Sequence, residues 1–134
     1  MPLLDREFLR EIYTAEERIG ADYPDVTREV FPNLIRQVPK AADGEGFIAY
    51  TRLDAATADA VIQEQIAFFK LIGADFEWKL YDYDAPPDLK ERLAAHGFEI
   101  EEPESLMILP LAAAPATLLA PITHDVRRLT TPAE

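Results

Sequence analysis

The stretch FEWKLYDYDAPPDLKERLAAHGF, from Phe76 to Phe98, indicates which fold the sequence adopts. Its first part, Phe76–Tyr81, is rich in aromatic and apolar residues and predicts a strand. An acidic corner follows, and Pro86 and Pro87 then favour the start of a helix, where a missing N–H group costs nothing. The stretch therefore predicts a strand, a corner and a short helix.

The end of this short helix has its own signature. Leu89 and Leu93 form its apolar face, and Gly97 fits the left-handed position that follows a last helical turn. Phe98 then falls where a Schellman motif places an apolar residue, over Leu93. These residues predict a helix that ends just before Gly97.

A strand and a long helix precede this stretch. Phe47–Leu53 predicts a central strand, in which Phe47, Ala49, Thr51 and Leu53 share one face. Residues 57–72 follow the i, i+3, i+4 rule of an amphipathic helix, with Thr57 as its N-cap and Gly73 as its end. Because the order is strand, long helix, strand, the two strands are expected to pair in parallel.

The amino-terminal third predicts two helices and a strand. Apolar residues at helical spacing predict a helix over residues 4–19, which Gly20 ends. A second helix is expected over residues 25–31, since Pro32 would stop it. Leu34–Val38 alternates weakly and predicts a strand.

The carboxyl-terminal third changes in composition. Ser105–Leu111 is almost wholly apolar and predicts a last strand, with residues 98–104 as its hairpin partner. Residues 112–121 are rich in alanine and proline and are interpreted as a linker. Residues 122–134 are interpreted as the start of an unfinished second element, so the first domain is expected to span residues 1–111.

Composition excludes several classes of protein. The 134 residues are enough for one domain, and the net charge is −12. No lysine and arginine stripe is present, so neither nucleic acid nor an anionic membrane is an expected partner. There is no cysteine, which excludes disulfides and thiolate chemistry and fits a cytoplasmic location.

The whole succession of elements, together with LKERLAAHGFEIEEPESLMILPL, resembles the GNAT acetyltransferase superfamily. The stretch from Phe76 to Phe98 looks more specifically like the amino-terminal half of bacterial two-part GNAT proteins. The resemblance covers roughly residues 30–111. It implies an α/β (α+β) fold with a GNAT-like mixed central sheet and helices on both faces. It also implies acetyl-CoA as the cofactor of the full-length family protein.

The residues that would carry acetyl-CoA chemistry are absent. A GNAT enzyme follows its central strand with a glycine-bearing loop that holds the pyrophosphate, but Leu53–Val61 has no glycine and carries Asp54 and Asp59. Many GNAT enzymes have a tyrosine acid four residues before the glycine of the Gly-Phe pair, where Leu93 stands here. The resemblance thus implies no catalytic, cofactor-binding or metal-binding residue in this chain.

The acidic corner offers the remaining site candidates. Tyr81, Asp82 and Asp84 lie at the carboxyl end of a parallel strand, where open α/β sheets tend to bind ligands. Tyr81 and Trp78 could add an aromatic surface there, but a core position is favoured for Trp78. A magnesium or acid–base cluster of Asp82, Asp84, Asp88 and Glu77 is conceivable. The alternative is a purely structural role, in which Asp84 and Asp88 cap the start of the helix and Asp82 is solvated. This structural alternative is favoured.

Two functional hypotheses follow. The first is a degenerate, non-catalytic GNAT-type domain that supports acetyl transfer from acetyl-CoA to an amine by a second domain. Its expected partner is that second GNAT-like domain or a second copy of itself in a homodimer. The alternative is a stand-alone protein-interaction module without enzymatic activity. The sequence does not identify the acceptor amine.

Overall fold

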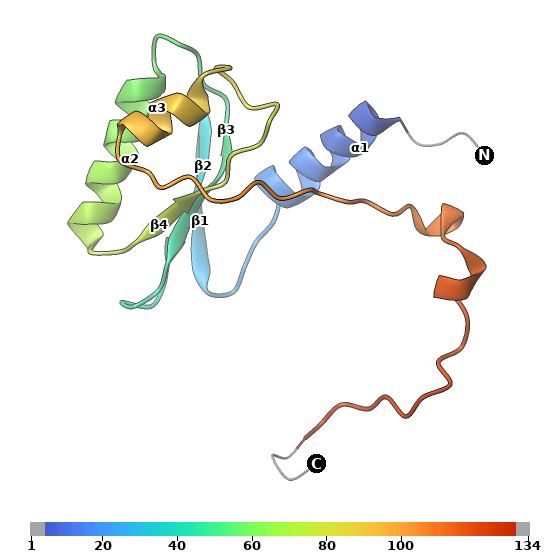
Figure 1. The fold of residues 1–134 in the computed structure, drawn as a ribbon. Helices are drawn as coiled ribbons and strands as arrows, with labels where there is room; N and C mark the ends of the chain where they lie inside the picture. The colour runs from blue at the N-terminus through green and yellow to red at the C-terminus, as the bar shows by residue number, and fades with distance from the viewer. Residues whose placement is uncertain (1–4, 131–134) are drawn as a thin grey trace. The chain divides into compact units, whose positions relative to one another are not determined.

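The computed structural model describes residues 5–130 of the chain. The chain divides into two compact units, residues 1–103 and residues 104–134. In its described part, the first unit combines a four-stranded mixed sheet with three α-helices, α1, α2 and α3 (Figure 1). No helix in residues 5–130 is long and apolar enough to cross a membrane.

The amino-terminal helix has two parts. α1 spans Arg6–Tyr13, and the chain continues directly into η1, a π-helical segment over Thr14–Ile19. The wider turn is seen where Gly20 N donates to Ala15 O, five residues back, at 2.9 Å. The helix predicted over residues 4–19 is thus confirmed for the described residues, and residue 4 lies outside them.

The apolar stripe predicted for this helix is not buried. Phe8 and Ile12 are 47% and 43% exposed, whereas Arg18 is buried to 3% exposure. The π-helical segment holds an extra residue in its turn, so positions after Tyr13 are rotated relative to regular α-helical spacing. Arg18, which the regular helical spacing did not predict to be buried, lies in this rotated segment.

The sheet consists of four strands in chain order. Neighbours along β1-β2-β3 are antiparallel, and β4 pairs with β3 in parallel, as predicted from the long helix between them. The strands are β1 Val26–Phe31, β2 Leu34–Pro39, β3 Gly46–Thr51 and β4 Phe76–Trp78. β4 is shorter than the predicted strand, which extended to Tyr81.

The helix predicted over residues 25–31 is wrong, because this segment forms β1. Val26, Thr27 and Val30 are β-branched and favour a strand. The whole segment pairs with β2, from Val26 opposite Pro39 to Phe31 opposite Leu34. A six-residue segment has too few turns to be stable as an isolated helix, so the ladder with β2 decides its structure.

β3 contains an extra residue at Ala49. Ile48 lies opposite Arg36 and Tyr50 lies opposite Ile35, so two steps along β3 correspond to one step along β2. The predicted face shared by Ala49 and Thr51 is therefore wrong, because such a bulge breaks the alternation of side chains.

Helices α2 and α3 form where the sequence predicts them. α2 spans Ala58–Ile72 and α3 spans Leu89–Ala95. Phe98 N donates to Leu93 O and Gly97 N donates to Ala94 O, which is the Schellman pattern. Gly97 has φ +93°, as the left-handed position requires. The predicted end of this helix is therefore confirmed.

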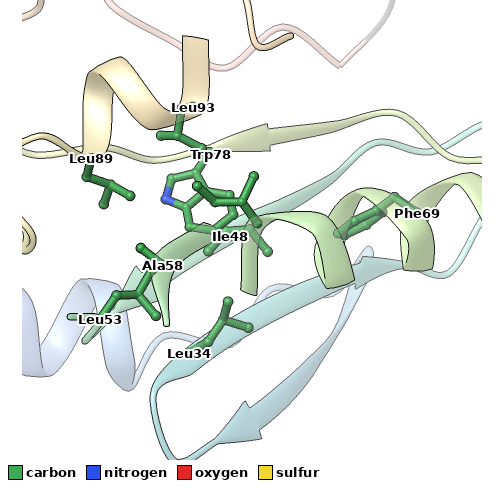
Figure 2. Close-up of a cluster of buried hydrophobic side chains, with 9 residues drawn as sticks. Leu34, Ile48, Leu53, Ala58, Phe69, Trp78, Leu89 and Leu93 are labelled. Atoms are coloured by element: carbon green, nitrogen blue, oxygen red, sulfur yellow. The ribbon is translucent and has the colours of Figure 1, made fainter. Parts of the chain in front are cut away.

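The core lies between the sheet and the helices α2 and α3. Figure 2 shows Trp78 of β4 beside Leu89 and Leu93 of α3, with Ile48 of β3 below them. Phe98 packs against the same cluster, and its ring meets the Trp78 ring edge-on with centroids 6.0 Å apart. The buried members are Leu34, Ile48, Leu53, Ala58, Ile62, Phe69, Trp78, Leu89 and Leu93.

The second unit has little regular structure in its described part. It contains two 3-10 turns, Leu111–Ala113 and Ala116–Leu118. The strand predicted over Ser105–Leu111 is wrong, as is its hairpin partner over residues 98–104, since neither segment is a strand. A strand requires a neighbour that pairs with its peptide groups, and neither segment pairs with a strand in residues 5–130.

Candidate functional site

A buried ion pair between Arg18 and Asp84 forms the centre of the candidate site. Arg18 Nη1 and Nη2 donate to Asp84 Oδ1 and Oδ2 at 2.8 and 2.9 Å, a bidentate arrangement. Both side chains are almost fully buried. Burial of two charges is tolerated only with good geometry and further hydrogen bonds, and both are present here.

The further hydrogen bonds tie Arg18 to two strands. Its Nε donates to Ala49 O, the carbonyl at the bulge of β3, at 3.1 Å. Its Nη2 also lies 3.5 Å from Lys79 O, just after β4. Lys79 N, just after β4, donates to Ile48 O of β3 at 3.1 Å. Beyond that bond, the Arg18 side chain bridges the carbonyls of the two strands.

Four tyrosines surround the ion pair, and together with Arg18 and Asp84 we call them the arginine–tyrosine cluster. The Arg18 guanidinium lies 3.9 Å from the ring centre of Tyr81. It lies 5.3 Å from that of Tyr50 and 5.5 Å from that of Tyr83. The fourth tyrosine, Tyr13, shares a 2.8 Å hydrogen bond between its hydroxyl and that of Tyr81. Cation–π contacts of this kind stabilise a desolvated guanidinium.

The protonation of the cluster follows from these contacts. Burial lowers the pKa of Arg18, but hydrogen bonding and the charge of Asp84 outweigh it, so that this pKa is raised. Burial raises the pKa of the Tyr81 hydroxyl, and the hydrogen bond with Tyr13 raises it further. The arginine thus stays charged and the Tyr81 phenol stays protonated at neutral pH, which suits positioning rather than proton transfer.

An open cavity of about 450 Å³ adjoins the cluster. One wall comes from α1 and η1, a second from the end of β3, and a third from the loop after β4. Tyr50, Tyr83 and Asp84 of the cluster contribute to its lining. The Tyr83 hydroxyl is fixed by a 3.2 Å hydrogen bond with Thr14 Oγ1, which joins two of these walls.

The structure separates the four residues that the sequence selected at this corner. Tyr81 and Asp84 lie together in the cluster, where Tyr81 N also donates to Asp84 Oδ2 at 3.0 Å. Asp82 is exposed, and Trp78 is buried in the core beside α3. The expected role of Asp84 at the helix start is wrong, because its carboxylate bonds to Arg18 instead.

The members of the cluster that the sequence did not select are Tyr50, Tyr83, Arg18 and Tyr13. Arg18 and Tyr13 come from the amino-terminal helix. They lie more than 60 positions from Tyr81 and Asp84, and their spacing follows from a π-helical turn. Arg18 stands between acidic and apolar neighbours in EERIG, a context typical of a solvated helix end. The local pattern YDYD, in which acids alternate with tyrosines, is the only sequence signal at this place, and it identifies one half of the cluster.

A second polar cluster lies at the amino-terminal end of α2. Asp54 Oδ1 accepts hydrogen bonds from Ala56 N at 3.0 Å, and from the N and Oγ1 of Thr57, both at 2.8 Å. These bonds, above all that from the Thr57 hydroxyl, lower the pKa of Asp54. Thr57 occupies the N-cap position but its side chain makes no capping bond. Asp54 is therefore the residue whose side chain accepts hydrogen bonds from the N–H groups at the start of α2.

Helix α3 meets the same end of α2 through charged side chains. Arg92 binds Asp59 of α2 and Asp88, which lies just before α3. His96 Nε2 lies 2.9 Å from Asp59 Oδ1. The hydrogen bond with His96 and then that with Arg92 lower the pKa of Asp59, and Arg92 lowers that of Asp88. These acids thus link two helices.

The acids of the corner do not gather round a common point. In residues 5–130, no group of three His, Cys, Asp or Glu residues is placed to hold a metal ion. Glu77 Oε2 instead pairs with Lys79 Nζ at 2.6 Å on the surface. The hypothetical acid cluster of the sequence is therefore divided among three separate ion pairs and one exposed residue, Asp82.

Comparison with known proteins adds no relationship to this description. No family model matches the sequence, and neither the curated proteins nor the solved structures include a match.

Proposed function

We propose that this chain is a non-catalytic domain related to the GNAT acetyltransferases, which assists acetyl transfer from acetyl-CoA to an amine by a second, catalytic domain. The observation that carries the non-catalytic part is the position of Arg18. In a working GNAT domain, the central strands separate and the pantetheine of acetyl-CoA lies between them. Here the Arg18 side chain donates to Ala49 O of β3 and lies 3.5 Å from Lys79 O just after β4, which supports the proposal because a pantetheine arm would need this space.

The ion pair with Asp84 makes the Arg18 side chain difficult to displace. For a pantetheine arm to enter, Arg18 would have to leave Ala49 O and break its bidentate bond with Asp84. Breaking a buried pair and leaving one charge unpaired costs about 3–5 kcal/mol. A cofactor would need to supply that free energy in addition to its own binding, so weak or absent binding is expected.

The amino-terminal end of α2 supports the same interpretation. A GNAT enzyme uses backbone N–H groups at this place to hold pyrophosphate. The Ala56 and Thr57 N–H groups donate to the Asp54 carboxylate instead, and the Ala58 N–H donates to Asp54 O at 3.0 Å. Asp59 adds a second negative charge one position into the helix. A pyrophosphate would meet occupied donors and repulsion between like charges.

The position of the expected acid is also unsuited to catalysis. Leu93 is 2% exposed and belongs to the core under α3. It has no proton to donate to a departing thiolate, and its burial leaves no room for a polar replacement without loss of packing.

A supporting role requires a surface that another domain or copy can cover. α1 exposes Phe8 and Ile12, and the edge strand β1 exposes Val30 and Phe31. Exposed apolar side chains beside an unpaired strand edge are common features of protein interfaces. The same surfaces would serve the alternative, a stand-alone interaction module, equally well.

The decisive experiment is a calorimetric titration of acetyl-CoA into the chain at moderate salt. We expect no binding with a dissociation constant near or below about 10 μM, which corresponds to some 7 kcal/mol. Coenzyme A without the acetyl group is the matched ligand, and it should behave in the same way. Binding of either at or below that concentration would refute the non-catalytic proposal.

A second measurement separates the supporting role from the interaction module. Acetyl transfer to a panel of amines is measured with the chain alone and with an added acetyl-CoA-binding GNAT domain from a two-part protein. The proposal expects no transfer by the chain alone and a change in the rate or amine preference of the added domain. No effect of the chain on that domain would favour the interaction module.

A further inference from the structure

The cavity beside the arginine–tyrosine cluster carries exposed guanidinium groups in a strongly acidic protein. The net charge of the protein is −12. Four charged residues line the cavity, namely Arg10, Glu11, Arg52 and Asp84. Asp84 pairs with Arg18 and Arg10 pairs with Glu7, so Arg52 and Glu11 remain without an ion pair in residues 5–130. A guanidinium group without a charged partner favours an anionic ligand.

Arg52 is the residue most available to such a ligand. It follows β3 directly, and its backbone N–H is fixed by a 2.8 Å hydrogen bond to Asn33 O. Its guanidinium group is exposed and makes no hydrogen bond or ion pair with any residue between 5 and 130. Guanidinium groups bind carboxylates in a bidentate, charge-assisted manner, so an unpaired one at a cavity rim is a suitable anchor.

Arg10 is held at a second wall of the same cavity. Its guanidinium lies 5.0 Å from the ring centre of Tyr83, and its ion pair with Glu7 is long, at 3.5 Å, and exposed. An exposed pair of this kind contributes little stability, so Arg10 can exchange it for a ligand at small cost.

The rest of the lining favours a flat, apolar group on the ligand. Tyr50 and Tyr83 contribute aromatic surface, and Ala15 and Ile19 contribute aliphatic surface from η1. The volume of about 450 Å³ is within the usual range for small-molecule sites, and the hydrogen bond from Thr14 to Tyr83 holds one wall in place. Aromatic side chains pack well against planar rings.

We propose that this cavity binds a small aromatic carboxylate, with its carboxylate at Arg52 and Arg10 and its ring against Tyr50 and Tyr83. The Arg52 guanidinium disfavours a cationic amine in the same position. The inference rests on the lining of the cavity and stands whether or not the chain takes part in acetyl transfer.

The test uses three probes of similar shape and different charge on the full chain. They are 4-hydroxyphenylacetate, which is anionic, its neutral amide, and tyramine, which is cationic. Each is titrated to about 10 mM while backbone amide shifts are followed by NMR. We expect saturable shifts with the anion at residues 50–52 and 83–85. The amide and tyramine should bind at least about ten-fold more weakly, because they lack the charge-assisted bonds.

Two variants complete the test. Arg52→Gln removes the anchor without removing a side-chain hydrogen bond or ion pair within residues 5–130, and it should weaken anion binding at least about five-fold with an otherwise unchanged spectrum. Lys90→Gln, which removes an exposed positive charge from α3, is the control and should not weaken it. The proposal is overturned if the anion gives no saturable shifts, if tyramine binds as tightly as the anion, or if the two variants bind alike.

Discussion

Arg18 and Asp84 form a bidentate ion pair in which both side chains are at most 3% exposed. The pair connects η1 to the loop that follows β4, two segments that make no β-ladder with each other. The ion pair fixes the position of the amino-terminal helix against the sheet, because the Arg18 guanidinium also binds Ala49 O of β3. A buried charge in this position has to keep its partner.

Removal of one partner is therefore expected to be costly. Asp84→Ala should lower the free energy of unfolding by about 3–5 kcal/mol, since Arg18 is left charged and unpaired. Urea denaturation measures this loss. Glu77→Gln breaks the exposed pair with Lys79 and is the control, with an expected loss of about 0–1 kcal/mol.

Replacement of both partners distinguishes charge from packing. The double variant Arg18→Met with Asp84→Leu should be more stable than either single replacement by a residue of similar size, because no unpaired charge remains. Additive losses in the double variant would show that the two side chains do not depend on each other.

Gly97 is expected to tolerate asparagine and to reject valine. Its φ of +93° lies in the left-handed region, although no atom lies within 4 Å of an added Cβ. The cost is therefore one of backbone conformation, and Gly97→Val should lose about 1–3 kcal/mol. Gly97→Asn should lose less, and Asp82→Asn should stay within about 0.5 kcal/mol of the native chain. Equal urea midpoints for the valine and asparagine variants at Gly97 would contradict this assignment.

Acid should destabilise the chain partly through the cluster at the end of α2. The pKa values of Asp54, Asp59 and Asp88 are lowered in the folded chain. A carboxyl with a lowered native pKa stabilises the fold above its ordinary pKa, and this contribution is lost as pH falls through the native value. Thermal unfolding between about pH 6 and pH 2 should show this decline.

The Asp54→Asn variant tests whether the carboxyl groups at the end of α2 cause the loss of stability in acid. Its unfolding temperature should fall less steeply with decreasing pH than that of the native chain, because one group with a lowered pKa has been removed. Asp82→Asn, which removes one exposed acid, controls for the change in net charge. Identical slopes for the native chain and Asp54→Asn would assign the acid sensitivity to other groups.

The second unit is expected to exchange its amide hydrogens rapidly. Its long apolar side chains are largely exposed, including Met107 at 89% and Leu111 at 77%, and its regular structure over residues 104–130 is limited to two 3-10 turns. Such a segment has little buried surface to offset ordering costs of about 1–2 kcal/mol per residue. Hydrogen exchange with mass spectrometry measures the protection of residues 106–130.

Self-association would increase the hydrogen-exchange protection of the second unit. Exposed apolar side chains promote pairing with a second copy, so protection of residues 106–130 should rise with protein concentration if a dimer forms. Light scattering on the same samples reports the size. Strong protection in a strict monomer would contradict the expectation and favour a self-sufficient module.

The elements that the sequence predicts well are those with local signals. The end of α3 is set by Leu93, Gly97 and Phe98, which lie within six residues of one another. α2 is long enough for its apolar period to be unambiguous. Parallel pairing of β3 and β4 follows from the helix between them.

The errors have non-local causes. Val26–Phe31 is a strand because of its ladder with β2, and Ser105–Leu111 lacks such a ladder despite its apolar composition. In both cases pairing outweighs composition. Arg18 could not be selected because a π-helical turn shifts its direction, and its partner Asp84 was assigned a local role at the start of α3.

The separation of 66 positions between Arg18 and Asp84 has a consequence during synthesis. Chains grow at about 5–20 residues per second, so Arg18 leaves the ribosome roughly 3–13 s before Asp84 can reach it. Until then Arg18 can reach Ala49 O of β3 but has no carboxylate partner. The amino-terminal helix therefore gains its buried ion pair only after the strands β1 to β3 have been made.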